Sequence, residues 1–208
     1  MMGSTQAKVA LLFSGGIDSM LLAERAHKAG RLGALVFIAY EQPSQAQEFN
    51  AVSDWANSRG YKVDVVSAEI AGVDDCMAIG PTEDGLRILP GRNMVMCAHA
   101  ANVAATRGCT ILWYGANADD KDYPDCNRNF VGAMNHSLAA SMIAVELEAP
   151  LIDMTKNQII EEAVNINMDI DKAWSCYESS SFNEPCGLCH SCTERSNALK
   201  TINNKERS

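Results

Sequence analysis

The sequence predicts an α/β fold, a Rossmann-like open parallel sheet with helices on both of its faces. Two observations lead to this class. Short apolar segments of strand length alternate along the chain with helical segments of roughly 10–15 residues, and the first apolar segment breaks into two glycines directly before a helix. Alternation of this kind requires crossover connections, which produce parallel βαβ units. The 208 residues fit one domain, with room for a small appendage.

Each expected element follows from a local pattern. Residues 8–13 form an apolar run that ends in Ser-Gly-Gly, which predicts a buried strand and a turn. From Asp18 onward, apolar residues recur at helical spacing until Gly30 closes the helix. Thr155 and Gln158 form a capping box that opens another helix. The remaining expected elements are strands at 34–40, 61–66, 110–114 and 145–149, and helices at 44–58, 92–107, 128–144 and 155–165.

Two irregular stretches, 71–89 and 116–127, are expected to be long loops, which in compact domains usually carry function. No linker composition separates two independent domains. We therefore expect an α/β domain over 1–170 and a small cysteine-bearing lobe with a C-terminal helix over 171–208, packed as part of one unit. The polar tail beyond Leu199 is expected to fray.

The charge balance excludes several partners. Lys and Arg total 17 against 26 Asp and Glu, a formal net charge of −9. Such a chain has no general attraction to nucleic acid or to an anionic membrane, so any bound anion must be held by a local device. No apolar run approaches the length of a membrane span, and residues 1–7 lack the layout of a signal peptide. A cytoplasmic protein without direct nucleic-acid or membrane partners is expected.

The segment Ser14–Ser19, Ser-Gly-Gly-Ile-Asp-Ser, is the local device that an acidic protein needs. Its glycines let backbone amides approach an anion, and the following helix N-terminus adds partial positive charge. The alternative interpretation is a strand-to-helix turn without a ligand, in which Asp18 is the N-cap of the helix. The segment lacks the Lys of a Walker loop and the third Gly of a dinucleotide fingerprint. It resembles the Ser-Gly-Gly-x-Asp-Ser loop of the ATP pyrophosphatases, and the residues expected to bind ATP here are Phe13, Ser14, Gly15, Gly16, Ile17, Asp18, Ser19 and Met20.

Four of the eight cysteines are clustered: Cys176, Cys186, Cys189 and Cys192. In a reducing compartment this density indicates a metal rather than disulfides. Four thiolates satisfy a tetrahedral Zn²⁺ and leave no open position, so a structural zinc is expected, with His190 as a bystander and an iron–sulfur cluster as the chemical alternative. The other four cysteines are interpreted mainly as small buried hydrophobes.

Taken together, these motifs resemble the 7-cyano-7-deazaguanine synthase family over most of the chain, from Phe13 to about Ala198. The resemblance rests on the Ser14–Ser19 segment, which we call the phosphate loop, and on the cysteine pattern. It also rests on four further segments: Leu89-Pro-Gly-Arg-Asn93, Tyr123-Pro-Asp-Cys126, Glu148-Ala-Pro-Leu-Ile-Asp153 with Thr155-Lys156, and Trp174-Ser-Cys-Tyr177. It implies ATP-dependent conversion of 7-carboxy-7-deazaguanine and ammonia to 7-cyano-7-deazaguanine, with Mg²⁺ required and AMP and pyrophosphate released, by a homodimer. The alternatives are an enzyme that stops at the amide, another ATP pyrophosphatase such as a tRNA thiolase or an amidotransferase synthetase domain, and a non-enzymatic zinc-binding module.

The resemblance also suggests roles for individual residues. Asp18, Ser19 and Arg92 are expected in catalysis, since a guanidinium suits bidentate phosphate or carboxylate oxygens. Arg92 and Asn93 are further expected to contact the nucleotide, although each can also be an ordinary helix-start residue. Tyr123 and Asp125 are expected to bind the base, with turn formation after Pro124 as the alternative for Asp125.

Five further residues are not assigned to the expected site. Cys126 is left out of catalysis because activation by ATP makes a thioester unnecessary. Helix capping accounts for the Asp153–Lys156 region as well as a site contact does. Trp174 and Tyr177 are expected to pack in the core and the cysteine lobe.

The chain departs from the family pattern at three places. The 116–122 stretch is shorter than usual, Asn127 stands where an Arg is common, and 41–44 lacks the usual basic character. These departures put the details of the base pocket in doubt, but leave ATP use intact.

Overall fold

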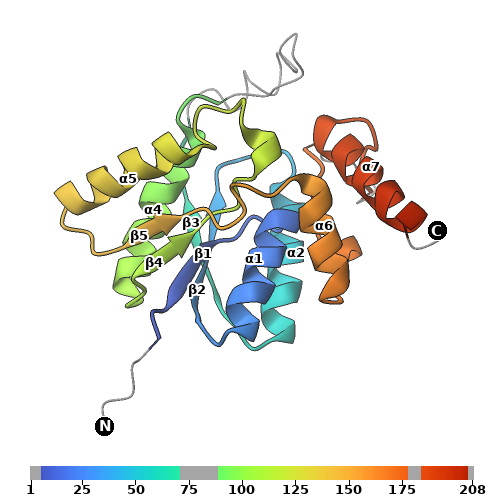
Figure 1. Cartoon of the computed structure of the whole chain (residues 1–208). Coiled ribbons are helices and arrows are strands. Elements are labelled where there is room, and N and C mark those ends of the chain that lie inside the picture. The colour runs from blue at the N-terminus through green and yellow to red at the C-terminus, as the bar shows by residue number, and fades with distance from the viewer. Residues whose placement is uncertain (1–5, 71–88, 178–183, 206–208) are drawn as a thin grey trace.

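The computed structural model describes residues 6–70, 89–177 and 184–205. Five parallel strands form one sheet in the order β3-β2-β1-β4-β5 (Figure 1). The strands are β1 Val9–Leu12, β2 Leu32–Ala39, β3 Val63–Ser67, β4 Ile111–Trp113 and β5 Glu146–Glu148. The predicted open parallel α/β sheet is therefore confirmed.

Helices cover both faces of the sheet (Figure 1). α1 (Ile17–Lys28), α2 (Gln45–Ser58) and α6 (Lys156–Asn165) contribute to one apolar cluster, and α4 (Arg92–Thr106) and α5 (Arg128–Ala140) contribute to the other. In β1 the two clusters take alternate residues, with Val9 and Leu11 on one side and Ala10 on the other. Burial on both faces explains why the strands read as continuous apolar runs.

The C-terminal segment packs against the α6 side of the sheet. Short 3₁₀ turns at Ala118–Asp120 and Ile170–Lys172 precede α7, His190–Lys205. Ala198 of α7 is buried in the same apolar cluster as Ile159 and Ile160 of α6. The expected fraying beyond Leu199 is wrong, because α7 continues as a helix to Lys205.

The end of α5 also differs from expectation. The helix stops at Ala140 rather than near residue 144. Met142 adopts a left-handed φ of 57°, and Ile143 N–H bonds to Leu138 O at 2.9 Å, which is the geometry of a Schellman cap. A glycine usually marks this position, so no stop signal for α5 is visible in the sequence. The expected loop at 71–89 lies almost entirely outside the described residues.

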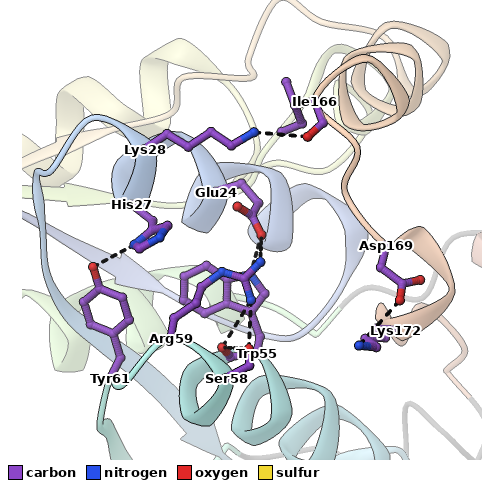
Figure 2. A network of polar contacts seen from close by, with 10 residues as sticks. All are labelled: Glu24, His27, Lys28, Trp55, Ser58, Arg59, Tyr61, Ile166, Asp169 and Lys172. Carbon is purple, nitrogen blue, oxygen red and sulfur yellow. Dashed lines mark hydrogen bonds and ion pairs between the residues drawn. The ribbon is translucent and has the colours of Figure 1, made fainter.

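A buried polar network joins α1 to α2 (Figure 2). Glu24, 6% exposed, accepts a hydrogen bond from Trp55 Nε1 at 2.9 Å and forms an ion pair with Arg59. The Arg59 guanidinium lies 4.5 Å from the centroid of the Trp55 ring, a cation–π contact. Nearby, His27 Nδ1 and the Tyr61 hydroxyl oxygen form a second hydrogen bond at 3.0 Å. These contacts hold together the two helices that flank the loop after β1.

Two sequence expectations concern the apolar interior. Cys97 and Cys109 are buried among apolar residues, as predicted for small hydrophobic side chains; Cys76 lies outside the described residues. In the part of the chain that the structure describes, no helix has both the length and the apolar character needed to cross a membrane.

Candidate active site

A pocket of about 260 Å³ opens at the carboxyl edge of the sheet. The strand order places β2 on one side of β1 and β4 on the other, so the connections diverge at this edge, as they do at the ligand sites of open α/β folds. Segments far apart in sequence line it, namely the loop after β1, the end of β2, the start of α4, the loop after β4, the start of α6, the segment before Cys176 and the start of α7.

The loop after β1 has the geometry of an anion cradle. Gly15 has φ +81°, and a Cβ there would lie 2.8 Å from the Glu48 carbonyl oxygen, so only glycine fits. Gly16 precedes α1 in an extended conformation, and among the described residues no side chain caps that helix start. Ser19 Oγ donates to Gly16 O at 3.0 Å and accepts from Ser14 Oγ at 3.3 Å. The helix start is thus left open toward the pocket.

Asp18 is not the cap of α1. Its two carboxylate oxygens accept hydrogen bonds from Lys156 Nζ at 2.7 and 2.9 Å, in a pair whose side chains are only 17% and 23% exposed. Burial alone would lower the pKa of Lys156, but the carboxylates of Asp18 and Asp120 raise it above its ordinary value. A cation is therefore held beside the phosphate loop.

Lys156 stands at the first position of α6, and the expected capping box at Thr155 and Gln158 is present there. Its backbone N–H donates to Asp119 Oδ2 at 2.7 Å, which ties the helix start to the loop after β4. The capping box expected in this region is therefore confirmed, and Lys156 also lines the pocket. Asp153, by contrast, pairs with Arg128 at the surface, where both side chains are largely exposed.

Arg92 begins α4 directly after Gly91, which has a left-handed φ of 71°. Its guanidinium lines the pocket and is hydrogen-bonded to Tyr40. Burial disfavours its charge, but Tyr40, Tyr177 and Asp125 outweigh that effect and raise its pKa. Arg92 is thus a half-buried, permanently charged group rather than a surface arginine.

The other expected residues divide into two groups. Phe13, Asn93 and Tyr123 line the pocket, whereas Asp125 is bonded to α4: its Oδ2 accepts from Asn93 N at 3.0 Å. Met20 is 3% exposed within the apolar core, behind the loop rather than in the pocket. The role expected for Asp125 in base recognition competes with this helix-start bond.

The structure explains two residues of the loop after β4 without a catalytic role. Asn127 is the N-cap of α5, and its side chain accepts from Phe130 N at 3.0 Å, which explains its presence without a ligand. Cys126 lies at the pocket, but burial, with Asp120 and Asp125 nearby, raises its pKa to about 12. A protonated thiol is a poor nucleophile, which favours leaving Cys126 out of catalysis.

The segment before the cysteine cluster reaches the phosphate loop. Trp174 N–H donates to Gly15 O at 2.9 Å, and both Trp174 and Tyr177 line the pocket. These two aromatic residues were expected to pack in the core and the cysteine lobe, and the structure shows that they also lie at the pocket. Ser191 and Glu194, at the start of α7, line the same pocket.

Sequence reasoning also missed the start of α2. Gln42, Ser44 and Glu48 line the pocket next to Arg92. The available signal was their place directly after β2, at the edge where all parallel strands end.

The four clustered cysteines converge, with their sulfur atoms all within 4.8 Å of one another. Zn–S bonds of about 2.3 Å place tetrahedral sulfurs about 3.8 Å apart, so the arrangement fits such an ion. N–H groups point at sulfur, as thiolate ligands require: Cys186 N donates to Cys176 Sγ at 3.3 Å, and the hydrogen bond from Leu188 N helps lower the pKa of Cys186 to about 7. The donor set therefore suits a thiophilic metal.

The strand order and the glycine loop at this sheet edge define the class: an α/β protein with an open parallel sheet and a pocket at the carboxyl edge of its strands. Solved structures support the fold. The U34-tRNA thiolase NcsA from Methanococcus maripaludis has a TM-score of 0.51 at 18% identity, over 97% of this chain and 67% of that one. A predicted subunit of tRNA methyltransferase from Methanocaldococcus jannaschii has a TM-score of 0.53 at 21% identity, over 76% and 75%.

The particular family follows from the sequence comparison. The family model described as "Queuosine biosynthesis protein QueC" matches residues 8–203, and the chain belongs to this family. Two relatives called 7-cyano-7-deazaguanine synthase are each 33% identical to it. The one from Caldicellulosiruptor bescii aligns over 96% of this chain and 95% of its own length, and the one from Prochlorococcus marinus (strain NATL1A) over 97% and 96%.

Proposed function

We propose that this chain converts 7-carboxy-7-deazaguanine and ammonia into 7-cyano-7-deazaguanine at the expense of ATP. The observation that carries the proposal is the joint lining of one pocket by the phosphate loop, Lys156 and Arg92, in a member of the QueC family. Two separate cationic groups and an open helix start suit a reaction that brings a triphosphate and a carboxylate together.

In the first half of the proposed reaction, a substrate carboxylate oxygen attacks the α-phosphorus of ATP and pyrophosphate leaves. Ammonia then attacks the activated carbonyl carbon and displaces AMP, which gives the amide. The backbone amides of Ser14–Ser19, with Ser19 Oγ, would receive the departing pyrophosphate. Lys156 would neutralise part of its charge. The work of these groups is positioning and charge stabilisation.

In the second half, the amide oxygen attacks the α-phosphorus of a second ATP and displaces pyrophosphate. Cleavage of the C–O bond then releases AMP, and loss of the two N–H protons leaves the nitrile. The same pocket must hold first an anion and then a neutral amide. Arg92, anchored by Tyr40, is the group we assign to the carboxylate or to a phosphate oxygen. Mg²⁺, when bound, would share the neutralisation of phosphate charge, and Asp18 offers the carboxylate beside the loop that could hold it.

The metal at the cysteine cluster is proposed to be one structural zinc, since four sulfur ligands leave no open position for chemistry. Elemental analysis should find about one zinc per chain. Iron, with a visible absorption band, would replace this assignment by an iron–sulfur cluster. A homodimer, a cytoplasmic location and the 1–170 and 171–208 division also remain proposals, based on the family resemblance and the sequence.

The deciding experiment supplies the protein with ATP, Mg²⁺, ammonium and 7-carboxy-7-deazaguanine, and identifies products by mass spectrometry. We expect the nitrile, with AMP and pyrophosphate. AMP and pyrophosphate without conversion of the deazaguanine would contradict the assignment. In a parallel reaction the amide is supplied directly. Its conversion to the nitrile supports the full reaction, and an untouched amide would show an enzyme that stops at the amide.

A further inference from the structure

The polar residues at the start of α2 form a preorganised group that the steps above do not use. Ser44 Oγ donates to Glu48 Oε1 at 2.7 Å, and Gln42 Nε2 donates to Glu48 Oε2 at 2.8 Å. Ser44 and Gln42 are 2% and 4% exposed, and all three residues line the pocket. We call these three residues the Glu48 cluster.

Neighbouring residues fix the orientation of the Glu48 carboxylate. Gln42 Oε1 accepts from Tyr40 N at 3.0 Å, so its amide group is fixed with the NH₂ toward Glu48. The Glu48 backbone carbonyl abuts Gly15, which ties the cluster to the phosphate loop. Two buried donors each occupy one lone pair of a carboxylate that can accept about four hydrogen bonds. The carboxylate of Glu48, a residue that lines the pocket, therefore keeps acceptor capacity.

The electrostatics favour a ligand that donates hydrogen bonds. Burial raises the pKa of Glu48, while its bonds to Ser44 and Gln42 and the nearby charge of Arg92 lower it. Removing a carboxylate from water without new donors is costly, and donors from a ligand relieve that cost. A half-buried carboxylate held in this way selects for a pair of N–H groups.

Among the two heterocycles of the proposed reaction, only one presents such a pair. The guanine-like edge of the deazaguanine carries N1–H and the 2-amino group side by side, both donors. The corresponding edge of adenine carries a donor next to an acceptor nitrogen, so one of the two contacts with a carboxylate would be repulsive. Matching two parallel donors to two carboxylate oxygens is the geometry of the strongest charge-assisted pairs.

We propose that Glu48, held by Ser44 and Gln42, is the specificity-determining residue that receives the N1–H and 2-amino edge of the deazaguanine substrate. The inference rests on the proposed function, and deepens it by assigning the base-recognition group. It places base recognition on α2, rather than on Asp125, whose carboxylate bonds to the start of α4.

The first test needs no variant. The wild-type protein is assayed with 7-carboxy-7-deazaguanine and with the analogue that lacks the 2-amino group. We expect kcat/KM for the analogue to be about tenfold to a hundredfold lower, because a site built to bind a polar group rejects a ligand that lacks this group. Equal turnover of the two compounds would overturn the inference.

The second test compares Glu48→Gln with Glu69→Gln, a matched change at an exposed carboxylate. Glu48→Gln should raise KM for the deazaguanine at least tenfold, leave KM for ATP within threefold, and erase the discrimination against the analogue. Glu69→Gln should change none of these. A rise in KM for ATP instead would assign the cluster to the nucleotide. Ser44→Ala keeps the carboxylate but loosens it, and should give a smaller change in the same direction if Glu48→Gln fails to fold.

Calorimetry with 7-deazaguanine itself separates this inference from the proposed function. Binding by the wild type, weakened at least tenfold in Glu48→Gln, supports the inference even if no product forms from the carboxylate. Equal binding by both proteins overturns it while leaving the proposed function intact. A wild-type protein that neither binds 7-deazaguanine nor converts the carboxylate would overturn both.

Discussion

The phosphate loop and the Glu48 cluster line one pocket but are built in opposite ways. The loop is a continuous segment, Ser14–Ser19, whose useful groups are backbone amides. The cluster works through side chains that hold one another, supported by Tyr40 and by the charge of Arg92 from another part of the chain. In the proposed function the loop would supply a general affinity for anions, whereas the cluster would distinguish one ligand from another. Generic binding would then be encoded locally, and selectivity would depend on tertiary structure.

The largest expected effect comes from removing the metal, because the cysteine lobe contacts both regions. Trp174 bonds to Gly15, and Tyr177 lies near Arg92. Chelation, or Cys189→Ser, should lower the free energy of unfolding by about 3 kcal/mol or more, since metal binding contributes to folding. It should also weaken ATP binding at least tenfold, measured by calorimetry below the unfolding temperature. His190→Ala is the control and should keep the metal. A metal-free protein that stays stable and binds ATP normally would contradict this prediction.

The next effect concerns the phosphate side alone. Lys156→Ala leaves the Asp18 carboxylate uncompensated beside the loop, so it should repel the phosphates as well as remove a cation. We expect kcat/KM for ATP to fall roughly 10²–10³-fold, the size of one lost preorganised contact. The matched control is Lys172→Ala, whose exposed pair with Asp169 spans 3.5 Å. If the two variants behave alike in an assay of AMP release, the contrast between the regions fails.

A pH effect should also arise on the phosphate side. Burial raises the pKa of Asp120 to about 6, although Lys156 partly opposes the shift. The folded protein therefore takes up this proton more readily than the unfolded chain, whose Asp titrates near pH 4. Asp120 thus destabilises the fold above pH 6, and this penalty disappears as the pH falls toward 4, by about 1–3 kcal/mol.

Asp120→Asn should remove that pH dependence and raise stability at pH 7, and its amide oxygen can still accept the hydrogen bond from Asn117 N, 3.2 Å in the native chain. Asp122→Asn is the control at an exposed neighbour. Urea unfolding between pH 4 and pH 7 measures both. Parallel curves for the wild type and Asp120→Asn would show that the penalty is absent.

The smallest expected effect concerns the backbone that leads into the Glu48 cluster. The phosphate loop places a glycine at its left-handed residue, but the segment that leads into the Glu48 cluster uses Glu41, with φ +62°. Because left-handed backbone costs a residue with a Cβ about 1 kcal/mol or more, Glu41→Gly should stabilise the fold by up to about 1 kcal/mol, measured by denaturant midpoint. Met142→Gly, at φ +57°, should behave similarly while leaving KM values unchanged. Destabilisation by Glu41→Gly would show that the native residue holds the turn in another way.

Prediction from sequence succeeded where the residues that determine a feature lie close together in the chain. The strand–glycine–helix pattern, the capping box at Thr155 and the cysteine spacing are all local, and the structure has each of them. The end of α5 could not be found in this way, because Met142 occupies a position that glycine normally marks.

The pocket beyond the loop depends on contacts across the fold. Lys156 and Asp18 are brought together only once α6 packs beside α1, and Glu48 becomes a pocket residue only because β2 ends beside β1. Trp174 was interpreted as a packing residue because an aromatic side chain near a cysteine cluster usually is one. Its contact with the phosphate loop runs through the backbone N–H, which the residue type does not reveal.

The hydrogen bond from Trp174 to Gly15 also bears on the order in which the molecule is made. The loop that contains Gly15 is translated well before Trp174, the residue whose backbone closes over it. Domains begin to fold from the N-terminus while synthesis continues, and all five strands precede Trp174 in the chain. A nascent chain can therefore assemble its sheet before the pocket is complete. The proposed nucleotide site would thus form only after every strand of the sheet has been synthesised.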